Sequence, residues 1–372
     1  MNVLSLFDGI SCGMVALERA GINVDSYNAY EIEHNAIEIS KKNYPNIIHH
    51  GDVTKEDFTK YKGKVDLIIG GSPCQNLSIA GNKKGLEGEA SKLFYDYVRA
   101  LHESGAKWFL LENNESMTKE NCDIITDIMG VEPIMINSNL VSAQDRKRLY
   151  WTNIPNIEQP SDKGIFLKDI VQPTKDKQDY SIYERMIAKK EGTLAYKKAW
   201  SSVRTLDQKS KTLTTSHAIS NSGATNIKYT ESEYYLPTPI ECERLQTLPD
   251  NYTEGVSKTQ RYKAIGNGWT VDVIAHIFSY LKKAIDNNIP PIEVKSIERP
   301  KQSYRQLENT KIDKIEDIKI VVDKEKEDLK AKVKELIAEL EKDKEVIRTL
   351  QEQIKETKCK TFDFIIKGGS NG

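Results

Sequence analysis

One cysteine in the first quarter of the chain stands in a setting that could support chemistry. Cys74 follows Gly70-Gly71-Ser72-Pro73, which comes directly after a strand-like segment at 65–69. A lone cysteine is most often a small buried hydrophobic residue, and that interpretation stays open for Cys74 taken alone. In a loop of Gly, Ser and Pro at the end of a strand, a thiolate can instead be exposed and activated as a nucleophile. The Gly- and Lys-containing stretch 78–91 that follows is long enough to act as a mobile lid.

Charged residues next to two later apolar runs could assist such a nucleophile. Glu112 comes straight after Phe109-Leu110-Leu111, where a carboxylate is costly to bury unless it is paired or used in catalysis. Partial loss of water favours the protonated form of a carboxyl group, which suits a general acid. Arg146 and Arg148 would point to the same side of an extended segment and could hold a phosphate or a carbonyl oxygen. A basic cluster is otherwise usually solvated surface.

A glycine-containing turn from Gly9 to Gly13 joins the first predicted strand to the first predicted helix. It matches the Gly-x-Ser-x-Gly nucleophile elbow of hydrolases, but that elbow needs preceding strands and an oxyanion-hole loop, for which residue 11 leaves no room. The turn can instead let the backbone approach a ligand. Glu31, at the end of the second strand, could accept from both ribose hydroxyls of a nucleoside, and Asp52, after the third, from an exocyclic adenine amine. Together these positions predict a cofactor that contains adenosine.

These residues need a scaffold that brings strand ends together, and the pattern up to about residue 150 predicts one. Short apolar runs alternate with helical stretches, which predicts an α/β fold with a mostly parallel, doubly wound sheet and helices on both faces. Ligands of such sheets bind beyond the carboxyl ends of the strands. Strands are predicted at 3–7, 26–30, 47–49, 67–69 and 109–111, and helices at 14–20, 34–43 and 93–104.

The remaining chain differs in composition from segment to segment. Residues 155–235 are rich in turn residues, Lys, Arg and Tyr with poor periodicity, which indicates a small second domain or long loops. Order returns at 236–286, and prolines mark a linker at 287–310. Beyond it, ten positions spaced alternately by four and three residues include eight apolar ones, which predicts a coiled coil at 311–358, followed by a tail at 359–372. A self-associating coiled coil is the favoured interpretation, and a lone helix that packs back on the body is the alternative.

Composition restricts the class of protein. The chain of 372 residues has no run of about 18 apolar residues and no signal-peptide pattern at its start, so we expect a cytoplasmic protein. The five cysteines form no Cys-x-x-Cys pair or Cys/His cluster, which argues against a disulfide framework and a structural zinc site. The net charge of −1 does not by itself indicate nucleic-acid binding, but residues 137–233 carry 16 Lys/Arg against 11 Asp/Glu, a modest basic excess.

In their order along about residues 1–285, the motifs resemble those of the cytosine-C5 DNA methyltransferase family. The resemblance is to bacterial and phage members, and Lys211-Thr212-Leu213-Thr214-Thr215 is similar to the animal de novo enzymes. Ser11 and Asn114 depart from the usual residues at their positions, and neither change removes a reactive group. The segments that carry the resemblance are Phe7-Asp8-Gly9-Ile10-Ser11-Cys12-Gly13, Gly71-Ser72-Pro73-Cys74-Gln75, Glu112-Asn113, Gln144-Asp145-Arg146-Lys147-Arg148, Pro239-Ile240-Glu241-Cys242-Glu243-Arg244-Leu245-Gln246 and Tyr262-Lys263-Ala264-Ile265-Gly266-Asn267-Gly268.

The resemblance implies a Rossmann-like S-adenosylmethionine-dependent fold, built from 1–154 and 236–286, with 155–235 as the target-recognition region. It also implies that Cys74 attacks C6 of a cytosine flipped out of the duplex, which activates C5 for methylation. Glu112 would assist at N3, and Arg148 would hold O2 with Arg146 as a support of the same site, without any metal. The implied cofactor-binding positions are Phe7, Asp8, Gly9, Ser11, Gly13, Glu31, Asp52 and Asn267.

Two other functions fit part of the pattern. A tRNA cytosine-C5 methyltransferase has the same motifs, but such enzymes usually carry Pro-Pro-Cys and Cys-Phe-Thr, whereas this chain has Ser72-Pro73-Cys74 and no Cys-Phe-Thr. A catalytically silent DNA-binding scaffold is the second alternative, although every reactive position is filled.

If the substrate is double-stranded DNA, the side chains that could contact it are Gln75, Ser78, Lys83, Lys84, Arg204, Lys211 and His217.

Overall fold

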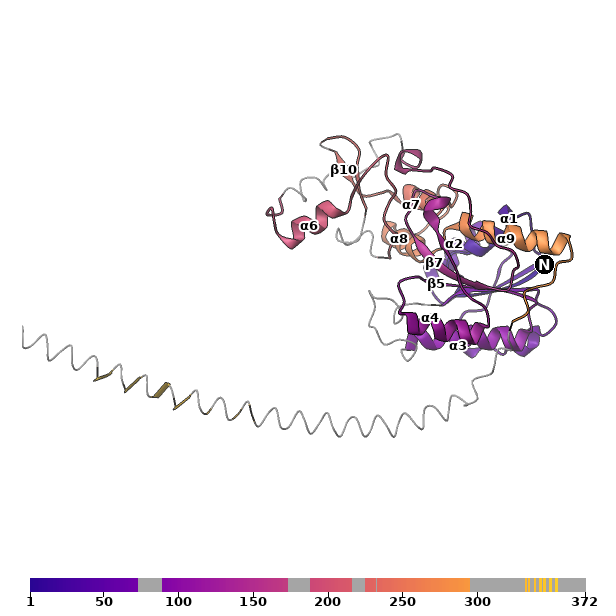
Figure 1. The fold of residues 1–372 in the computed structure, drawn as a ribbon, viewed down its shortest axis with the longest axis horizontal. Coiled ribbons are helices and arrows are strands. Elements are labelled where there is room, and N and C mark those ends of the chain that lie inside the picture. Colours follow the sequence, from indigo (N-terminus) through magenta and orange to yellow (C-terminus); the bar gives the residue numbers. More distant parts are fainter. Residues whose placement is uncertain are drawn as a thin grey trace, which may run out of the picture. The chain divides into compact units, whose positions relative to one another are not determined.

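The computed structural model of the chain (Figure 1) describes residues 1–72, 89–172, 188–215, 225–231 and 233–294, together with scattered positions between 332 and 353. The chain divides into two units, Met1–Ile297 and Glu298–Gly372. In the second unit the described residues are helical and exposed, and Arg348 pairs with Glu345 at 3.2 Å. All ten positions of the predicted heptad seam lie outside the described residues, so the coiled coil stays a prediction.

A seven-stranded sheet forms the centre of the first unit, with the strand order β3-β2-β1-β4-β5-β7-β6. Strands β1 to β5 run parallel, and β7 is antiparallel to both of its neighbours. This sheet confirms the predicted mostly parallel α/β fold. The strands are β1 (Asn2–Leu6), β2 (Ser26–Tyr30), β3 (Ile48–His49), β4 (Leu67–Gly71), β5 (Trp108–Asn114), β6 (Ile134–Asn137) and β7 (Lys147–Thr152).

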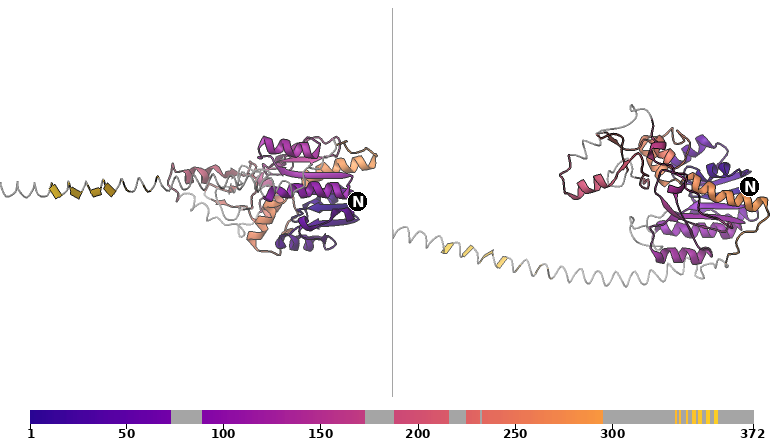
Figure 2. Two further views of the ribbon diagram at one scale, coloured as in Figure 1. Left: turned by 90° about the horizontal axis from the view of Figure 1, so that it is seen from below. Right: turned by 45° about the horizontal axis from the view of Figure 1, so that its top comes forward.

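Helices cover both faces of this sheet, as Figures 1 and 2 show, and each face has its own hydrophobic core. One face packs against α1 (Cys12–Arg19), α2 (His34–Asn43) and α9 (Val271–Asp286). The other packs against α3 (Glu89–Ser104) and α4 (Lys119–Met129). The central strands are buried on both sides, which explains their nearly continuous apolar sequences. Among the described residues, no helix combines the length and the apolar character needed to cross a membrane.

The predicted target-recognition region contributes a second sheet of order β10-β9-β8. Its hydrophobic residues, such as Leu213 and Ile227, pack with Leu245 and Ile265 in one core. The region is therefore joined by packing to the last part of the α/β fold, and the predicted domain boundaries themselves stay predictions. The elements that form this part are α6 (Leu194–Ser201), β8 (Val203–Thr205), β9 (Asn226–Lys228), β10 (Tyr234–Tyr235), α7 (Pro239–Leu245) and α8 (Lys258–Asn267).

Several elements extend beyond their predicted ends, toward the edge of the sheet where ligands are expected. Strand β5 continues to Asn114 instead of ending at 111, because Glu112 and Asn114 pair in register with Tyr150 and Arg148 of β7. Helix α1 begins at Cys12 instead of 14. Apolar periodicity marks the buried face of an element, and polar residues that follow it can continue the same backbone conformation.

Candidate active site

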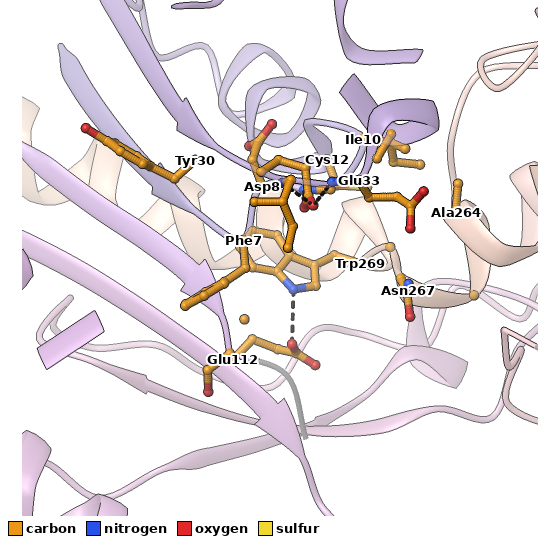
Figure 3. Close-up of a pocket in the computed structure, with 18 of the residues that line it drawn as sticks. Phe7, Asp8, Ile10, Cys12, Tyr30, Glu33, Glu112, Ala264, Asn267 and Trp269 are labelled. Carbon is orange, nitrogen blue, oxygen red and sulfur yellow. Dashed lines mark hydrogen bonds between the residues drawn. The ribbon is translucent and has the colours of Figure 1, made fainter. Parts of the chain in front are cut away.

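A cavity of about 460 Å³ opens at the carboxyl ends of β1, β2, β4 and β5, where the sequence predicts ligand binding (Figure 3). Its volume suits a small molecule that contains a nucleoside. The turn after β1 and the end of α8 form opposite parts of the wall. Of the residues predicted to bind the cofactor or to act on the base, those that line this cavity are Phe7, Asp8, Gly9, Glu31, Asp52, Glu112, Arg146, Arg148 and Asn267.

The turn after β1 has an unusual backbone that Asp8 holds in place. Phe7, Gly9 and Ser11 have φ of 56°, 61° and 58°. Glycine adopts this left-handed region freely, whereas it costs about 1–2 kcal/mol at each of the other two residues. The Asp8 carboxylate accepts hydrogen bonds from the hydroxyls of Ser5 at 2.6 Å, Tyr27 at 2.7 Å and Ser11. Burial raises the pKa of Asp8 to about 6, while these hydroxyl donors act in the opposite direction.

Ser11 and Gly13, both predicted to bind the cofactor, lie behind the turn. Ser11 is fully buried, and its hydroxyl contacts Asp8 and, at 2.6 Å, the hydroxyl of Ser40. A Cβ on Gly13 would lie 2.4 Å from Cδ1 of Ile69 and 2.9 Å from the hydroxyl of Tyr27, so glycine lets α1 pack closely against the sheet without moving these side chains. The structure therefore gives these two residues supporting contacts, and their side of the turn faces the core.

The two carboxylates at the ends of β2 and β3 are held by backbone and hydroxyl donors. Glu31 accepts from the amide N–H of Gly9 at 2.9 Å and from those of the two residues that follow it, both at 2.8 Å. Asp52 accepts from the amide and hydroxyl of Thr54 at 3.0 and 2.8 Å, which lowers the pKa of Asp52. Its other oxygen lies 3.4 Å from Nζ of Lys55. Both carboxylates remain on the cavity wall.

Two wall features next to Glu31 were not predicted from the sequence. Ile32 is 76% exposed, although it is a large apolar residue, and it lines the cavity. Glu33 accepts a hydrogen bond from Nζ of Lys263 at 2.6 Å, which lowers the pKa of Glu33 and joins α8 to the start of α2 across the cavity rim. In the sequence, the signal for the role of Ile32 was an apolar residue directly after the predicted ribose-binding Glu31. The hydrogen bond between Lys263 and Glu33 joins residues 230 positions apart, so no local pattern in the sequence indicates it.

Glu112 stands at the other end of the cavity between two donors. Nε of Arg148 lies 3.0 Å from Oε1, and Nε1 of Trp269 donates to Oε2 at 3.1 Å (Figure 3). The side chains of Glu112 and Arg148 are 12% and 14% exposed, so the pair is largely shielded from water. Trp269 was not singled out from the sequence, although it directly follows the Gly266-Asn267-Gly268 motif.

The proposed nucleophile lies just beyond the described part of β4. Gly71 is paired in register with Glu112. The side-chain amide of Asn113 donates through Nδ2 to the carbonyl oxygen of Ser72 at 3.3 Å and to its hydroxyl at 3.2 Å. Ser72, the last described residue after β4, therefore lies on the side of the cavity that holds Glu112. Cys74 itself, and the predicted DNA contacts Gln75, Ser78, Lys83, Lys84 and His217, lie outside the described residues.

The two arginines that the sequence predicts as a pair have different partners. Arg148 lies in β7 and pairs with Glu112. Arg146 precedes that strand, is 4% exposed, and donates to three carbonyl oxygens: that of Leu213 at 2.9 Å, Gly266 at 3.2 Å and Gly268 at 3.1 Å. Arg146 therefore connects the recognition region to the segment after α8.

Arg204 and Lys211, predicted to contact DNA, belong to the recognition region. Arg204 donates to the carbonyl oxygens of Ser201 at 3.1 Å and Val203 at 2.7 Å. Burial, and then the charge of Arg204, lower the pKa of Lys211. The two cations are therefore close enough to repel each other, as expected of side chains that would gain from binding an anion.

Comparison with known proteins agrees with the motifs. Residues 1–283 match the family described as C-5 cytosine-specific DNA methylase. The chain is 29% identical over 330 residues to the type II methyltransferase M.FnuDI of Fusobacterium nucleatum, covering 77% of this chain and 95% of that protein. It is 33% identical over 193 residues to the type II methyltransferase M.Eco47II of Escherichia coli, covering 46% of each chain, so the similarity spans about half the length of that relative.

Solved structures show the same fold. The S. pombe Dnmt2 methyltransferase superposes with a TM-score of 0.59 at 18% identity, covering 77% of this chain and 99% of that one. At this identity the likeness concerns the fold alone. The family match, in contrast, covers about three quarters of the chain and all the motifs noted above. The chain therefore belongs to the C-5 cytosine-specific DNA methylase family, which confirms the resemblance seen in its sequence.

Proposed function

We propose that this chain transfers a methyl group from S-adenosylmethionine to C5 of a cytosine in double-stranded DNA, with Cys74 as the nucleophile. The family and the type II methyltransferase relatives support DNA as the substrate over tRNA, and catalysis over a silent scaffold role. One observation carries the proposal. Glu112 lies on the cavity wall and is paired in register with Gly71, and Gly71 precedes Cys74 by three residues in the sequence. The reaction needs an acid close to the nucleophile, and in the sequence Cys74 follows the strand that neighbours the strand of Glu112.

The cavity fits the cofactor. Ile32 offers an exposed apolar surface for a planar base, and Glu31 and Asp52 carry acceptor oxygens beside it for ribose hydroxyls and an amine. We assign Phe7, Gly9 and the exposed Asn267 to the same ligand, because they line the cavity between these residues and Glu112. When bound, S-adenosylmethionine supplies the methyl group. The turn held by Asp8 and Ser11 keeps this wall in shape.

The side chains near Glu112 would act on the cytosine. A base within a duplex cannot be reached, so it must first be flipped into the site. Attack of the Cys74 thiolate on C6 forms a carbon–sulfur bond and makes C5 enamine-like, while Glu112 protonates or hydrogen-bonds N3. After C5 has gained the methyl group, a water molecule takes up the C5 proton, the electron pair re-forms the C5–C6 double bond, and Cys74 leaves as a thiolate while N3 returns its proton to Glu112. We assign Arg148 to the O2 of the base, with Arg146 as a support that joins this site to the recognition region.

A covalent trap tests this mechanism. Fluorine at C5 cannot leave as a proton, so DNA carrying 5-fluorocytosine should form a denaturation-resistant complex with the chain in the presence of S-adenosylmethionine. Cys74→Ala should abolish the complex. Cys122→Ala is the matched control, because Cys122 lies on α4 and should leave the complex unchanged. Methylation of cytosine by Cys74→Ala would contradict the mechanism, and bisulfite sequencing of DNA from cells that express the chain would identify the target site.

Three further features complete the proposal. The heptad spacing between 322 and 354 supports self-association of the C-terminal segment as a coiled coil. Relatives from bacteria and from Bacillus phages support action on DNA in the cytoplasm of a bacterial cell or a phage-infected host, beside a restriction enzyme, in protection of a phage, or as an orphan methyltransferase. Within the recognition region, Arg204 and Lys211 would bind phosphates, contacts that position DNA without specifying its bases.

A further inference from the structure

We infer that Trp269 is a positioning residue for Glu112, and that it holds one carboxylate oxygen while Arg148 holds the other. The inference rests on the proposed function, because it concerns the acid of that reaction. Trp269 follows α8 and is far from Glu112 in sequence, yet its indole lies between the turn after β1 and Glu112 (Figure 3).

The contacts divide the carboxylate between two donors of different kinds. The indole N–H of Trp269 donates to Oε2 at 3.1 Å, and Nε of Arg148 lies 3.0 Å from Oε1. A carboxylate with a single donor can rotate about its last side-chain bond. Two donors on separate oxygens, attached to separate parts of the chain, leave one orientation. The indole adds this restraint without adding a charge.

Gly71 on the neighbouring strand β4 leaves room for the hydrogen bond between Trp269 and Glu112. A Cβ on Gly71 would lie 2.7 Å from Oε2 of Glu112 and 3.1 Å from Nε1 of Trp269. Gly71 is not among the residues with positive φ, so its backbone does not by itself require glycine. Space for the Glu112–Trp269 hydrogen bond is therefore a sufficient reason for glycine at this position.

The backbone that carries Trp269 is fixed from the recognition side and from the cofactor side. Arg146 and Gln246 donate to the carbonyl oxygen of Gly268 at 3.1 and 3.0 Å. The hydroxyl of Thr270 donates to Gln246 at 2.7 Å. The backbone N–H of Trp269 contacts the sulfur of Cys12, a residue on the cavity wall. The indole is thus held firmly enough to orient the group that it contacts.

The test must distinguish the positioning of Glu112 from contact with the cofactor, because the side chain of Trp269 also lines the cavity. Hydrogen exchange at C5 of the cytosine distinguishes the two roles. Attack of Cys74 on C6, assisted by Glu112, lets C5 take up a proton from water, and reversal then releases a label from [5-³H]cytosine in DNA. This release consumes no methyl donor, so it can be measured without cofactor. Calorimetry with S-adenosylhomocysteine measures the cofactor side independently.

The test is Trp269→Phe, which keeps an aromatic ring and removes the N–H. Tritium release should fall about tenfold, the effect of losing one hydrogen bond to a charged group. Affinity for S-adenosylhomocysteine should stay within about twofold, and kcat for methylation should fall without a matching rise in KM for the cofactor. Trp151→Phe is the matched control: its indole N–H donates to Thr126 at 2.9 Å in the core, away from Glu112, and its loss should leave exchange unchanged.

Gly71→Ala gives a second approach that leaves Trp269 intact. The added methyl group would separate Trp269 from Glu112, so exchange should again fall while affinity for S-adenosylhomocysteine is kept. Normal exchange in both variants would overturn the inference, as would a loss of cofactor affinity with exchange unchanged. Wild-type chain that releases no tritium would instead refute the proposed function, and the inference with it.

Discussion

Replacing Asp8 by asparagine should stabilise the folded chain, and the gain should grow as the pH rises. Burial raises the pKa of Asp8 from 3.8 to about 6, although the hydroxyls of Ser11, Ser5 and Tyr27 donate to its carboxylate. The unfolded chain therefore loses this proton at a lower pH than the folded chain. As a result, the Asp8 carboxyl group does not affect the free energy of unfolding below about pH 4. Its contribution lowers that free energy progressively between about pH 4 and pH 6 and stays constant at higher pH.

The size of the effect follows from the raised pKa of Asp8. At 1.36 kcal/mol per unit, the ionised carboxylate costs about 3 kcal/mol at pH 8 and about half of that at pH 5. Asparagine has no charge to bury, but its single side-chain oxygen accepts fewer hydroxyl hydrogen bonds, at a cost of about 1 kcal/mol. The free energy of unfolding of Asp8→Asn should thus exceed that of wild type by about 2 kcal/mol at pH 8 and by less than about 1 kcal/mol at pH 5.

Urea denaturation at the two pH values, followed by tryptophan fluorescence, measures these differences. Asp52→Asn is the control. Hydrogen bonds from Thr54 lower the pKa of Asp52, so its carboxyl group is ionised in both the folded and the unfolded chain throughout this range. The stability of Asp52→Asn relative to wild type should therefore be the same at pH 5 and pH 8. A difference for Asp8→Asn that does not grow between these pH values would refute the reasoning.

Three further changes have expected outcomes. Lys263→Gln should weaken binding of S-adenosylhomocysteine less than about fivefold by calorimetry, because half-exposed ion pairs such as Glu33–Lys263 contribute about 1 kcal/mol or less; a larger loss would mean direct contact with the ligand. Gly13→Ala should lower stability by about 1–3 kcal/mol in urea, because its methyl group would overlap Ile69. Deletion of 301–372 should keep methyl transfer and lower the number of chains per particle that light scattering gives; an unchanged number of chains would contradict the coiled coil.

The sequence predicts the central part of the fold well because its signals there are local. Strand β2 and helix α2 have the predicted bounds, since turns and polar residues flank one apolar pattern in each. Glu31 and Asp52 were found in the same way, as acidic residues close behind predicted strands. Parallel strands bring such residues to one edge wherever they stand in the sequence, so the fold class alone predicts a shared cavity.

Local signals do not distinguish residues that line the cavity from residues that support it. Asp8, Ser11 and Gly13 belong to one motif, and the sequence predicts cofactor contact for all of them. In the structure, Asp8 lines the cavity, Ser11 is buried behind it, and Gly13 packs α1 against Ile69. The difference depends on which way each residue of a left-handed turn faces, and this depends on neighbours from other strands.

The contacts around Glu112 show why the last motif in the sequence acts at a site that the earlier strands build. Trp269 donates to Glu112 from a segment in which Arg146 and Gln246 hold the carbonyl oxygen of Gly268, and Arg146 also donates to the carbonyl oxygen of Leu213 in the recognition region. Arg146 therefore couples the recognition region to the segment that carries the indole. Such coupling joins residues more than a hundred positions apart, so no spacing in the sequence can indicate it, whereas three carbonyl oxygens around one buried guanidinium group do.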